Sequence, residues 1–317
     1  MKQRTTLLSA IWLFGSFAMA GEMGIEYGGG AMPSADGFDQ ARRPISNPTL
    51  FDLALPGTNI HPIFMYQNMP DSVSLANGPN LGLGGDFQLY ALQFEIAVNE
   101  RFSIVATKDG YIDFNPGQKL SDASGWANLG GGVKYAFVYD PVQRLAVSGT
   151  ATLELPTGNT DVFQGEGDGL LNLIVSAVKL YDNWQFAGAL GWQAPFSSEQ
   201  SHIGWLSAHA SYDMHQYFVP LVELNWFHTM DAGSGTRNFN EQLGGAVPGA
   251  VAFEGGDLIN LGARNATISR DIVTAAFGFR SRLTSSLDLG FAYELPLTDE
   301  DDGLMENRFT LDMVWRF

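Results

Sequence analysis

Residues 308–317, RFTLDMVWRF, are the stretch of sequence that decides the fold class. One parity is entirely apolar and consists of Phe309, Leu311, Met313, Trp315 and Phe317. The other parity consists of Arg308, Thr310, Asp312, Val314 and Arg316. Alternation with a period of two predicts a β-strand whose two faces differ. An apolar face opposite a charged face, on a strand that ends in Phe, is typical of the last strand of an outer-membrane β-barrel.

The same alternation recurs upstream and predicts ten further strands. With the last one, the expected ranges are 87–98, 102–110, 126–139, 144–155, 170–181, 184–194, 203–213, 217–228, 268–282, 287–296 and 307–317. If the chain ends on the side of the short turns, an oppositely directed strand must precede 87–98, and residues 59–68 are the suitable candidate. The sequence therefore predicts an all-β, antiparallel transmembrane barrel of about twelve strands. Ten or fourteen strands stay open, because residues 251–261 could also pair.

The connections between these strands alternate in length. Short links are expected at 99–101, 140–143, 182–183, 214–216 and 284–286, and long ones near 111–125, 156–169 and 229–267. Short periplasmic turns at one end and long extracellular loops at the other are typical of bacterial outer-membrane barrels. The longest connection, 229–267, could be a surface loop or could fold inward as a constriction.

Aromatic side chains gather near the predicted strand ends. Tyr-Asp pairs introduce three short turns, at 139–140, 181–182 and 212–213. Six tryptophans also lie close to strand ends, and they are Trp126, Trp184, Trp192, Trp205, Trp226 and Trp315. This placement predicts aromatic girdles at the two membrane interfaces. The alternative, aromatic side chains in a soluble β core, would place more of them in the middle of strands.

The first 58 residues differ from the rest. Residues 1–20 have a basic start, an apolar stretch and the small-x-small sequence Ala18-Met19-Ala20, which predicts a cleaved signal peptide. Residues 21–58 lack periodicity and are expected to form a periplasmic tail or an inward plug, with a disordered leader as the alternative. The barrel is expected to span 59–317. After Gly21 no run of 18 apolar residues occurs, so a spanning helix is not expected.

Charge and composition exclude several functions. Loss of Lys2 and Arg4 with the signal peptide changes the formal net charge from −17 to −19, so nucleic acid is not an expected partner. The chain has no Cys, which excludes disulfides and thiolate metal sites. The expected location is the outer membrane, with its lipid and lipopolysaccharide as partners. Phe317 resembles the terminal residue by which bacterial barrels are delivered to the barrel-assembly machinery.

The central hairpins resemble a known family. The quoted stretches are 125–135 (GWANLGGGVKY), 155–159 (LPTGN), 165–169 (GEGDG) and 188–192 (GALGW). They are similar to the outer-membrane family named for the MetA pathway of phenol degradation, best over residues 126–228. The resemblance implies a porin-like barrel that passes small aromatic or other hydrophobic compounds. It supplies no binding residues to carry over, and the solute itself stays unknown.

The polar parity of the strands supplies the candidate lumen-lining residues. They are Gln93, Glu95, Lys134, Arg144, Glu154, Glu223, Asn225, Arg280, Asp288, Glu294, Arg308 and Asp312. Both signs of charge occur, and a barrel of this size is narrow. We therefore expect a selective or gated passage for passive transport. The alternative is a closed structural or surface-interaction barrel whose charges form internal salt bridges.

No catalytic, metal or cofactor site is expected. Ser201 and His202 are neighbours, but adjacent residues of a strand point to opposite faces. Neither a Gly-x-Ser-x-Gly elbow nor a His-Glu-x-x-His helix occurs, so an outer-membrane hydrolase is the less favoured alternative. The acidic loops 165–169 and 299–302 lack calcium-loop spacing. Divalent cations could still bridge them to lipopolysaccharide.

Overall fold

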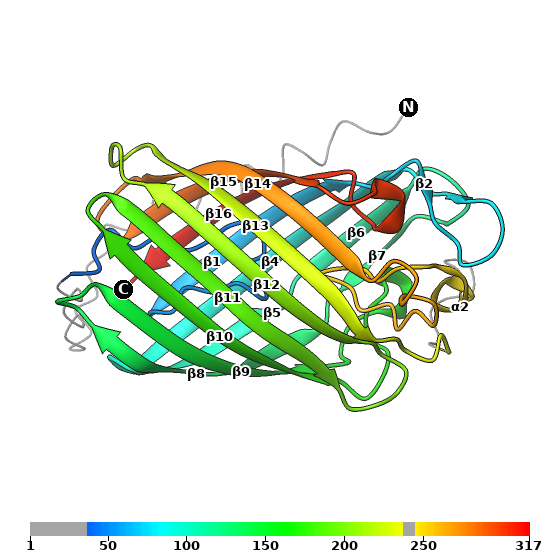
Figure 1. Ribbon diagram of the computed structural model, residues 1–317, viewed down its shortest axis with the longest axis horizontal. Helices are drawn as coiled ribbons and strands as arrows, with labels where there is room; N and C mark the ends of the chain where they lie inside the picture. Colours follow the sequence, from blue (N-terminus) through cyan, green and yellow to red (C-terminus); the bar gives the residue numbers. More distant parts are fainter. Residues whose placement is uncertain (1–36, 237–244) are drawn as a thin grey trace. The chain divides into compact units, whose positions relative to one another are not determined.

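A computed structural model describes residues 37–236 and 245–317, and the predicted signal peptide lies outside the described residues. The described chain forms a closed antiparallel barrel, because β1 pairs with both β4 and β16 (Figure 1). The strands of the wall are β1 (Asn59–Asn68), β4 (Gly85–Asn99), β5 (Phe102–Lys108), β6 (Tyr111–Pro116), β7 (Ala123–Trp126), β8 (Leu129–Asp140), β9 (Leu145–Leu155), β10 (Leu170–Tyr181), β11 (Trp184–Pro195), β12 (His202–Tyr212), β13 (Val219–Asp231), β14 (Asp271–Arg282), β15 (Leu287–Pro296) and β16 (Asn307–Arg316).

Two wall strands are interrupted, which is why fourteen segments make twelve strands. Both β5 and β6 pair with β4, at opposite ends of β4, so together they form one strand with a break at 109–110. At the break, the Asp109 carboxylate accepts a hydrogen bond of 2.9 Å from the Leu92 N–H. Similarly, β7 and β8 are two parts of one strand, broken at 127–128. The predicted all-β barrel of twelve strands is confirmed.

One detail of the predicted topology is wrong, and one alternative that the sequence left open is resolved. Residues 111–125 are largely β6 and β7 rather than a long loop, and only 117–122 connect them. The alternation of Tyr111, Ile112, Asp113 and Phe114 already indicated a strand at the start of this range. Residues 251–261 do not join the wall, and Val251 forms only an isolated bridge with Leu75. The remaining predicted strands agree with the observed ones to within a few residues at each end.

The two ends of the barrel differ as expected. Short turns and Phe317 lie at one end, on the left in Figure 1, and the longer connections lie at the other. We call these the short-turn end and the long-loop end. In its described part, the long-loop end carries a small hairpin of β2 (Ser72–Val73) and β3 (Leu81–Gly82) and the short helices η2 (Thr160–Val162), α2 (Val247–Ala250) and η4 (Glu300–Asp302). Within the described ranges, no helix is long and apolar enough to cross a membrane.

The wall is apolar outside and polar inside. On β4, Leu92, Phe94 and Ile96 are 44–51% exposed, whereas Gln93 and Glu95 between them are 3% exposed. A water-soluble sandwich has the opposite arrangement, because its exposed face is polar. A closed barrel with such an outer face spans a lipid bilayer, since every strand edge is paired and the apolar side chains meet lipid.

The aromatic girdle is present with one correction. Trp126, Trp184, Trp192 and Trp226 are each more than 40% exposed on the outer wall. Trp205 is 1% exposed and points inward, where its indole Nε1–H donates to the Leu50 carbonyl at 3.1 Å. Its position near a strand end predicted a girdle, but its parity on β12 is that of the buried Ile203 and Ser207. Parity decided the direction of the side chain.

Candidate transport path

Eleven of the twelve candidate lumen residues are buried on wall strands. They are Gln93, Glu95, Lys134, Glu154, Glu223, Asn225, Arg280, Asp288, Glu294, Arg308 and Asp312. Arg144 is different, because it lies in the turn before β9 with a positive φ of 52°. Its Nε–H donates to the Gly37 carbonyl at 2.9 Å at the short-turn end.

Many of the inward charges pair between wall strands that lie close together in the ring. Arg280 on β14 forms a fork with Asp312 on β16, at 2.8 and 2.7 Å, and His61 Nε2 lies 2.6 Å from the same carboxylate. Gly290 of β15 lies between the two strands. A Cβ there would be 2.1 Å from Asp312 Oδ1 and 2.9 Å from the Ile45 side chain. Only glycine leaves room for this ion pair beneath the chain that covers it.

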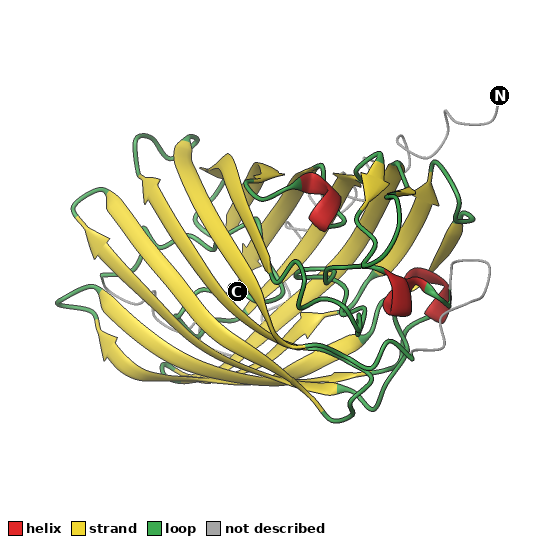
Figure 2. Cartoon of the chain, turned by 45° about the vertical axis from the view of Figure 1, so that its right-hand side comes forward, coloured by secondary structure: helices red, strands yellow, loops and turns green. Residues whose placement is uncertain are grey.

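Residues 37–58, which we call the inner segment, lie inside the barrel. Figure 2 shows loop segments within the ring of strands. The main chain of the inner segment bonds to side chains from many wall strands. Gln185 of β11 exchanges two hydrogen bonds of 2.6 Å with the Arg42 main chain. Arg280 donates to the carbonyls of Arg43 and Pro44 at 2.5 and 3.2 Å. Asp52 of the same segment contacts Lys134 of β8, which lies six strands from β14 in the ring of twelve, so the segment crosses the lumen between opposite walls.

The charged anchor of the inner segment is Asp52. Its carboxylate contacts Lys134 of β8 and lies 3.1 Å from the Arg43 guanidinium. Lys134 also donates to both oxygens of Glu95, at 3.0 and 2.9 Å. Burial by itself would raise the pKa of Asp52, but Arg43 and Lys134 outweigh burial and hold this pKa below its usual value. Asp52 is therefore an ionised partner for two buried cations.

A second anchor is a chain of three polar side chains. Ser211 Oγ lies 2.9 Å from His209 Nε2, and His209 Nδ1 lies 2.7 Å from Glu223 Oε1. The Glu223 carboxylate also accepts the main-chain N–H groups of Ile45, at 3.0 Å, and Ser46, at 2.7 Å. This group of three was not predicted from the sequence, although His209 and Ser211 share one parity of one strand.

Residues 251–263, which we call the inner loop, close the lumen from the long-loop end. Asp257 forms a fork with Arg308 of β16 at 2.7 and 2.8 Å. The Leu258 carbonyl accepts from Lys108 Nζ at 3.1 Å and from Gln164 Nε2 at 3.3 Å. Glu254 accepts the Ser201 hydroxyl and the N–H groups of 261 and 263, all at 2.6–2.7 Å. Burial raises the pKa of Glu254 above its usual value.

The inner loop also fills the lumen with apolar side chains. Phe253 and Leu261 are at most 1% exposed and belong to one hydrophobic cluster with inward residues of β1, β4 and β6. Phe163, next to η2, joins this cluster and meets Phe114 edge to face at 5.4 Å. Of the two arrangements left open for 229–267, the described part therefore shows the inward one.

Three small cavities lie among the described residues inside the barrel. A cavity of about 20 Å³ lies where the inner segment (Pro48, Thr49) approaches the inner loop (Leu258). Another, of about 30 Å³, lies at the long-loop end beside Arg308, and one of about 10 Å³ lies beside Ser211. Each admits a water molecule or two but no organic solute. In this conformation the lumen is closed.

Arg308 connects the wall with both closing elements. Its Nη1 donates to Asp257 of the inner loop and to the Ser46 carbonyl of the inner segment, at 2.7 and 3.3 Å, and it lies 3.6 Å from Glu294 Oε2. Its Nε donates to Gln67 of β1 at 3.0 Å.

Among the residues described, no cluster of His, Asp or Glu is arranged to hold a metal ion.

Comparisons with known proteins concern the fold. No family model matches the chain, and no curated protein matches it. A crystal structure of an outer-membrane channel from Pseudomonas putida F1 is similar, with a TM-score of 0.56 and 16% identity over 87% of this chain and 100% of the channel. The NanC porin gives a TM-score of 0.48 and 8% identity over 81% of this chain and 100% of the porin. At such identities the likeness extends to the barrel fold alone.

Proposed function

We propose that the protein lies in the outer membrane and provides passive passage for small solutes. In this proposal the inner segment and the inner loop are the closures, and a solute passes when they move aside. The observation that supports this proposal is that both elements are held in the lumen without being strands of the wall. No part of either element pairs as a strand of the wall, so their displacement leaves every ladder of the barrel intact.

The proposed solutes are hydrophobic or aromatic. Two features support this class. The first is the resemblance of residues 126–228 to a family that passes such compounds. The second is the apolar lining at the long-loop end, where Ile63, Phe87 and Phe114 of the wall pack against the inner loop. Once the inner loop leaves, this lining would be exposed to the lumen and would favour an apolar solute.

Conductance in planar bilayers and solute flux in liposomes test the proposal. We expect a low current from the wild type and a higher current from Asp257→Asn, which loses its ion pair with Arg308. Ser148→Ala is the matched control, because it removes a buried hydrogen bond between Ser148 and Ser176 within the wall. If neither protein conducts and no solute enters the liposomes, a barrel without transport is the better interpretation.

A second candidate, a serine hydrolase, is favoured by one observation. Ser211, His209 and Glu223 have the spacing of a nucleophile, a base and an orienting carboxylate. Against it, Ser211 is 3% exposed, and the neighbouring cavity of about 10 Å³ cannot hold an ester. A fluorophosphonate probe that labels the wild type, but not Ser211→Ala, would favour the hydrolase. The proposed passage predicts no labelling of either protein.

The route to the membrane is also a proposal. Export by a cleaved signal peptide and delivery through Phe317 are expected from the sequence. Phe317 is 59% exposed, and its main-chain N–H donates to the Thr58 carbonyl at 3.1 Å, next to the start of β1. Replacement of Phe317 by Ser should lower the amount of assembled barrel in outer-membrane fractions. Unchanged amounts would contradict this role.

A further inference from the structure

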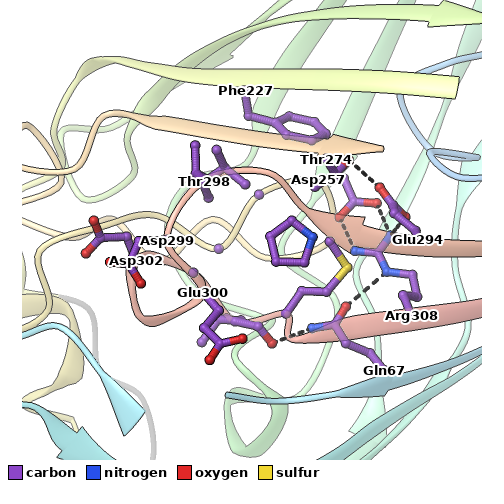
Figure 3. Close-up of a pocket in the computed structure, with 17 residues that line it drawn as sticks. Gln67, Phe227, Asp257, Thr274, Glu294, Thr298, Asp299, Glu300, Asp302 and Arg308 are labelled. Atoms are coloured by element: carbon purple, nitrogen blue, oxygen red, sulfur yellow. Dashed lines mark hydrogen bonds and ion pairs between the residues drawn. The ribbon is translucent and has the colours of Figure 1, made fainter. Parts of the chain in front are cut away.

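A hollow on the outer face of the wall is much larger than the cavities in the lumen. The lumen cavity beside Arg308 measures about 30 Å³, and the polar groups around it bond to one another, since Arg308 holds Asp257 and Gln67 (Figure 3). The outer hollow measures about 680 Å³ and is lined mainly by apolar side chains. Because this face of the barrel meets lipid, a component of the membrane fills the hollow.

The hollow lies across six neighbouring strands, from β8 to β13 (green to yellow in Figure 1). Its depth comes from two glycines among larger outward residues. Gly149 of β9 pairs with the exposed Tyr135 of β8. Gly204 of β12 pairs with the exposed Trp192 of β11 on one side and with His228 of β13 on the other. The outer surface is therefore depressed at the glycines and raised by the rings around them.

The wall itself does not require these two glycines. Neither Gly149 nor Gly204 has a positive φ. A Cβ on Gly149 would lie 3.7 Å from the Phe137 ring and 4.0 Å from the Ile174 carbonyl oxygen, which is ordinary contact. On Gly204 it would lie 3.2 Å from the flexible end of Met230. Glycine weakens the interior of a strand, so the space that it leaves here points to a ligand.

A guanidinium lies at the edge of the hollow nearest the long-loop end. The Thr229 N–H, between the lining residues His228 and Met230, donates to the Arg270 carbonyl at 2.8 Å. The Arg270 side chain is exposed, and its Nε–H donates to the Thr267 carbonyl at 3.2 Å. Its two Nη groups bond to no described residue. Arg270 is thus oriented by its own loop and has two donor groups to offer.

The carboxylate next to Arg270 is engaged elsewhere. Asp271 accepts from the Trp226 indole at 2.7 Å and lies 2.8 Å from His228 Nδ1. No salt bridge joins Arg270 to Asp271 or to another described carboxylate. A guanidinium recognises phosphate through parallel hydrogen bonds, and an apolar hollow takes a hydrocarbon chain. Together the two features fit a phosphorylated, acylated molecule.

We propose that the hollow binds an acyl chain of lipopolysaccharide and that Arg270 binds a phosphate of its lipid A. The long-loop end is the end that faces the cell exterior in bacterial outer-membrane barrels, and lipopolysaccharide lies in that leaflet. The site adds a membrane partner and does not depend on solute passage, because the hollow lies on the outer face of the wall.

Titration of the delipidated, detergent-purified protein with lipid A tests the phosphate contact. The wild type should bind lipid A about tenfold more tightly than dephosphorylated lipid A. Arg270→Gln should weaken binding of lipid A by the same factor and leave binding of the dephosphorylated form unchanged. Lys119→Gln, which removes an exposed cation from the connection between β6 and β7, is the matched control and should bind as the wild type does.

Gly149→Leu tests the hollow. It should weaken both forms of lipid A about tenfold, because the new side chain occupies the space of several methylene groups. Ala208→Leu is the matched control, since it adds the same side chain to an exposed outward position of β12 that does not line the hollow. Heat-dependent migration in electrophoresis checks that each variant is a folded barrel.

Several outcomes would overturn the site. They are equal weakening by the matched controls, equally tight binding of phosphatidylglycerol, or native mass spectra that show a dimer without lipid in place of a monomer that retains lipid A. Because these measurements require no flux, a conducting barrel that binds no lipid A would refute the site and leave the proposed passage intact.

Discussion

The wall of the barrel and the two elements that close it are held by different kinds of interaction. Each wall strand pairs with two neighbours through main-chain ladders, for example over twelve residue pairs between β10 and β11. The inner segment and the inner loop are held mainly by side chains of the wall that bond to their main chain or charges. Ladders resist the loss of any one residue, whereas a side-chain anchor depends on a single pair. A change in an anchor should therefore alter closure, and a change in the wall should alter folding.

The largest effect is expected from Asp52→Ala. It leaves Lys134 and Arg43 buried with fewer counter-charges, and breaking a buried ion pair in this way costs about 3–5 kcal/mol. Because the cost falls on the inward position of the inner segment, conductance should rise while the barrel still migrates as a folded species. Ser148→Ala serves as the wall control. Loss of the folded barrel without any rise in conductance would show that Asp52 stabilises the wall instead.

Acidification should separate the two closures. The pKa of Asp52 is held below its usual value of 3.8, so its contribution to closure is present above that value and is lost as the pH falls below it. The pKa of Glu254 is raised by burial, so its contribution is largest at low pH and is lost as the pH rises through the raised pKa. We expect higher wild-type conductance at about pH 3 than at pH 5, and no such acid response in Asp52→Asn.

The comparison of Asp52 with Glu254 also predicts a smaller response of conductance to pH, in the opposite direction. In Asp52→Asn, the remaining pH dependence should come from Glu254, with conductance that rises as the pH increases. Adding Glu254→Gln should remove it, because the amide does not ionise. An acid response that survives in Asp52→Asn would assign the titration to a group other than Asp52.

A wall substitution should affect stability and leave closure unchanged. Gly132 of β8 faces β9 so closely that a Cβ would lie 1.9 Å from the Ala151 carbonyl oxygen. Gly132→Ala should therefore destabilise the barrel by about 1–3 kcal/mol through overpacking. The measurement is the urea midpoint of unfolding, with conductance as the second readout. Raised conductance at an unchanged midpoint would reverse the proposed division between wall and closure.

The smallest effect is expected from Trp205→Phe. This change removes the hydrogen bond of 3.1 Å from the indole to the Leu50 carbonyl and keeps most of the apolar contact. The inner segment should lose about 1 kcal/mol, which raises conductance slightly. Trp226→Phe on the outer wall is the matched control, because Trp226 donates to Asp271 at 2.7 Å and contacts neither closure. An equal effect of both changes would remove the role assigned to Trp205.

The sequence alone determined the wall. Alternation along strands is local, so a barrel of about twelve strands and its inward parity were readable without any tertiary contact. Although a break separates β5 from β6, apolar and polar residues still alternate over 111–114. The prediction for Trp205 was wrong because it relied on distance from the strand end, although parity was available as the stronger signal. Lys134, Arg280 and Arg308, which the same parity placed on the inward face, are buried in the structure.

Only the tertiary structure decided what lies inside the wall. Residues 37–58 carry no periodicity, and their anchors lie far away in sequence, since Asp52 meets Lys134 and the Pro44 carbonyl meets Arg280. Likewise, nothing near Asp257 indicates that it pairs with Arg308. Such contacts depend on closure of the barrel, which brings side chains of distant strands around one axis. A periodic pattern specifies which face a residue occupies, but the partner it meets there is set by the closed geometry.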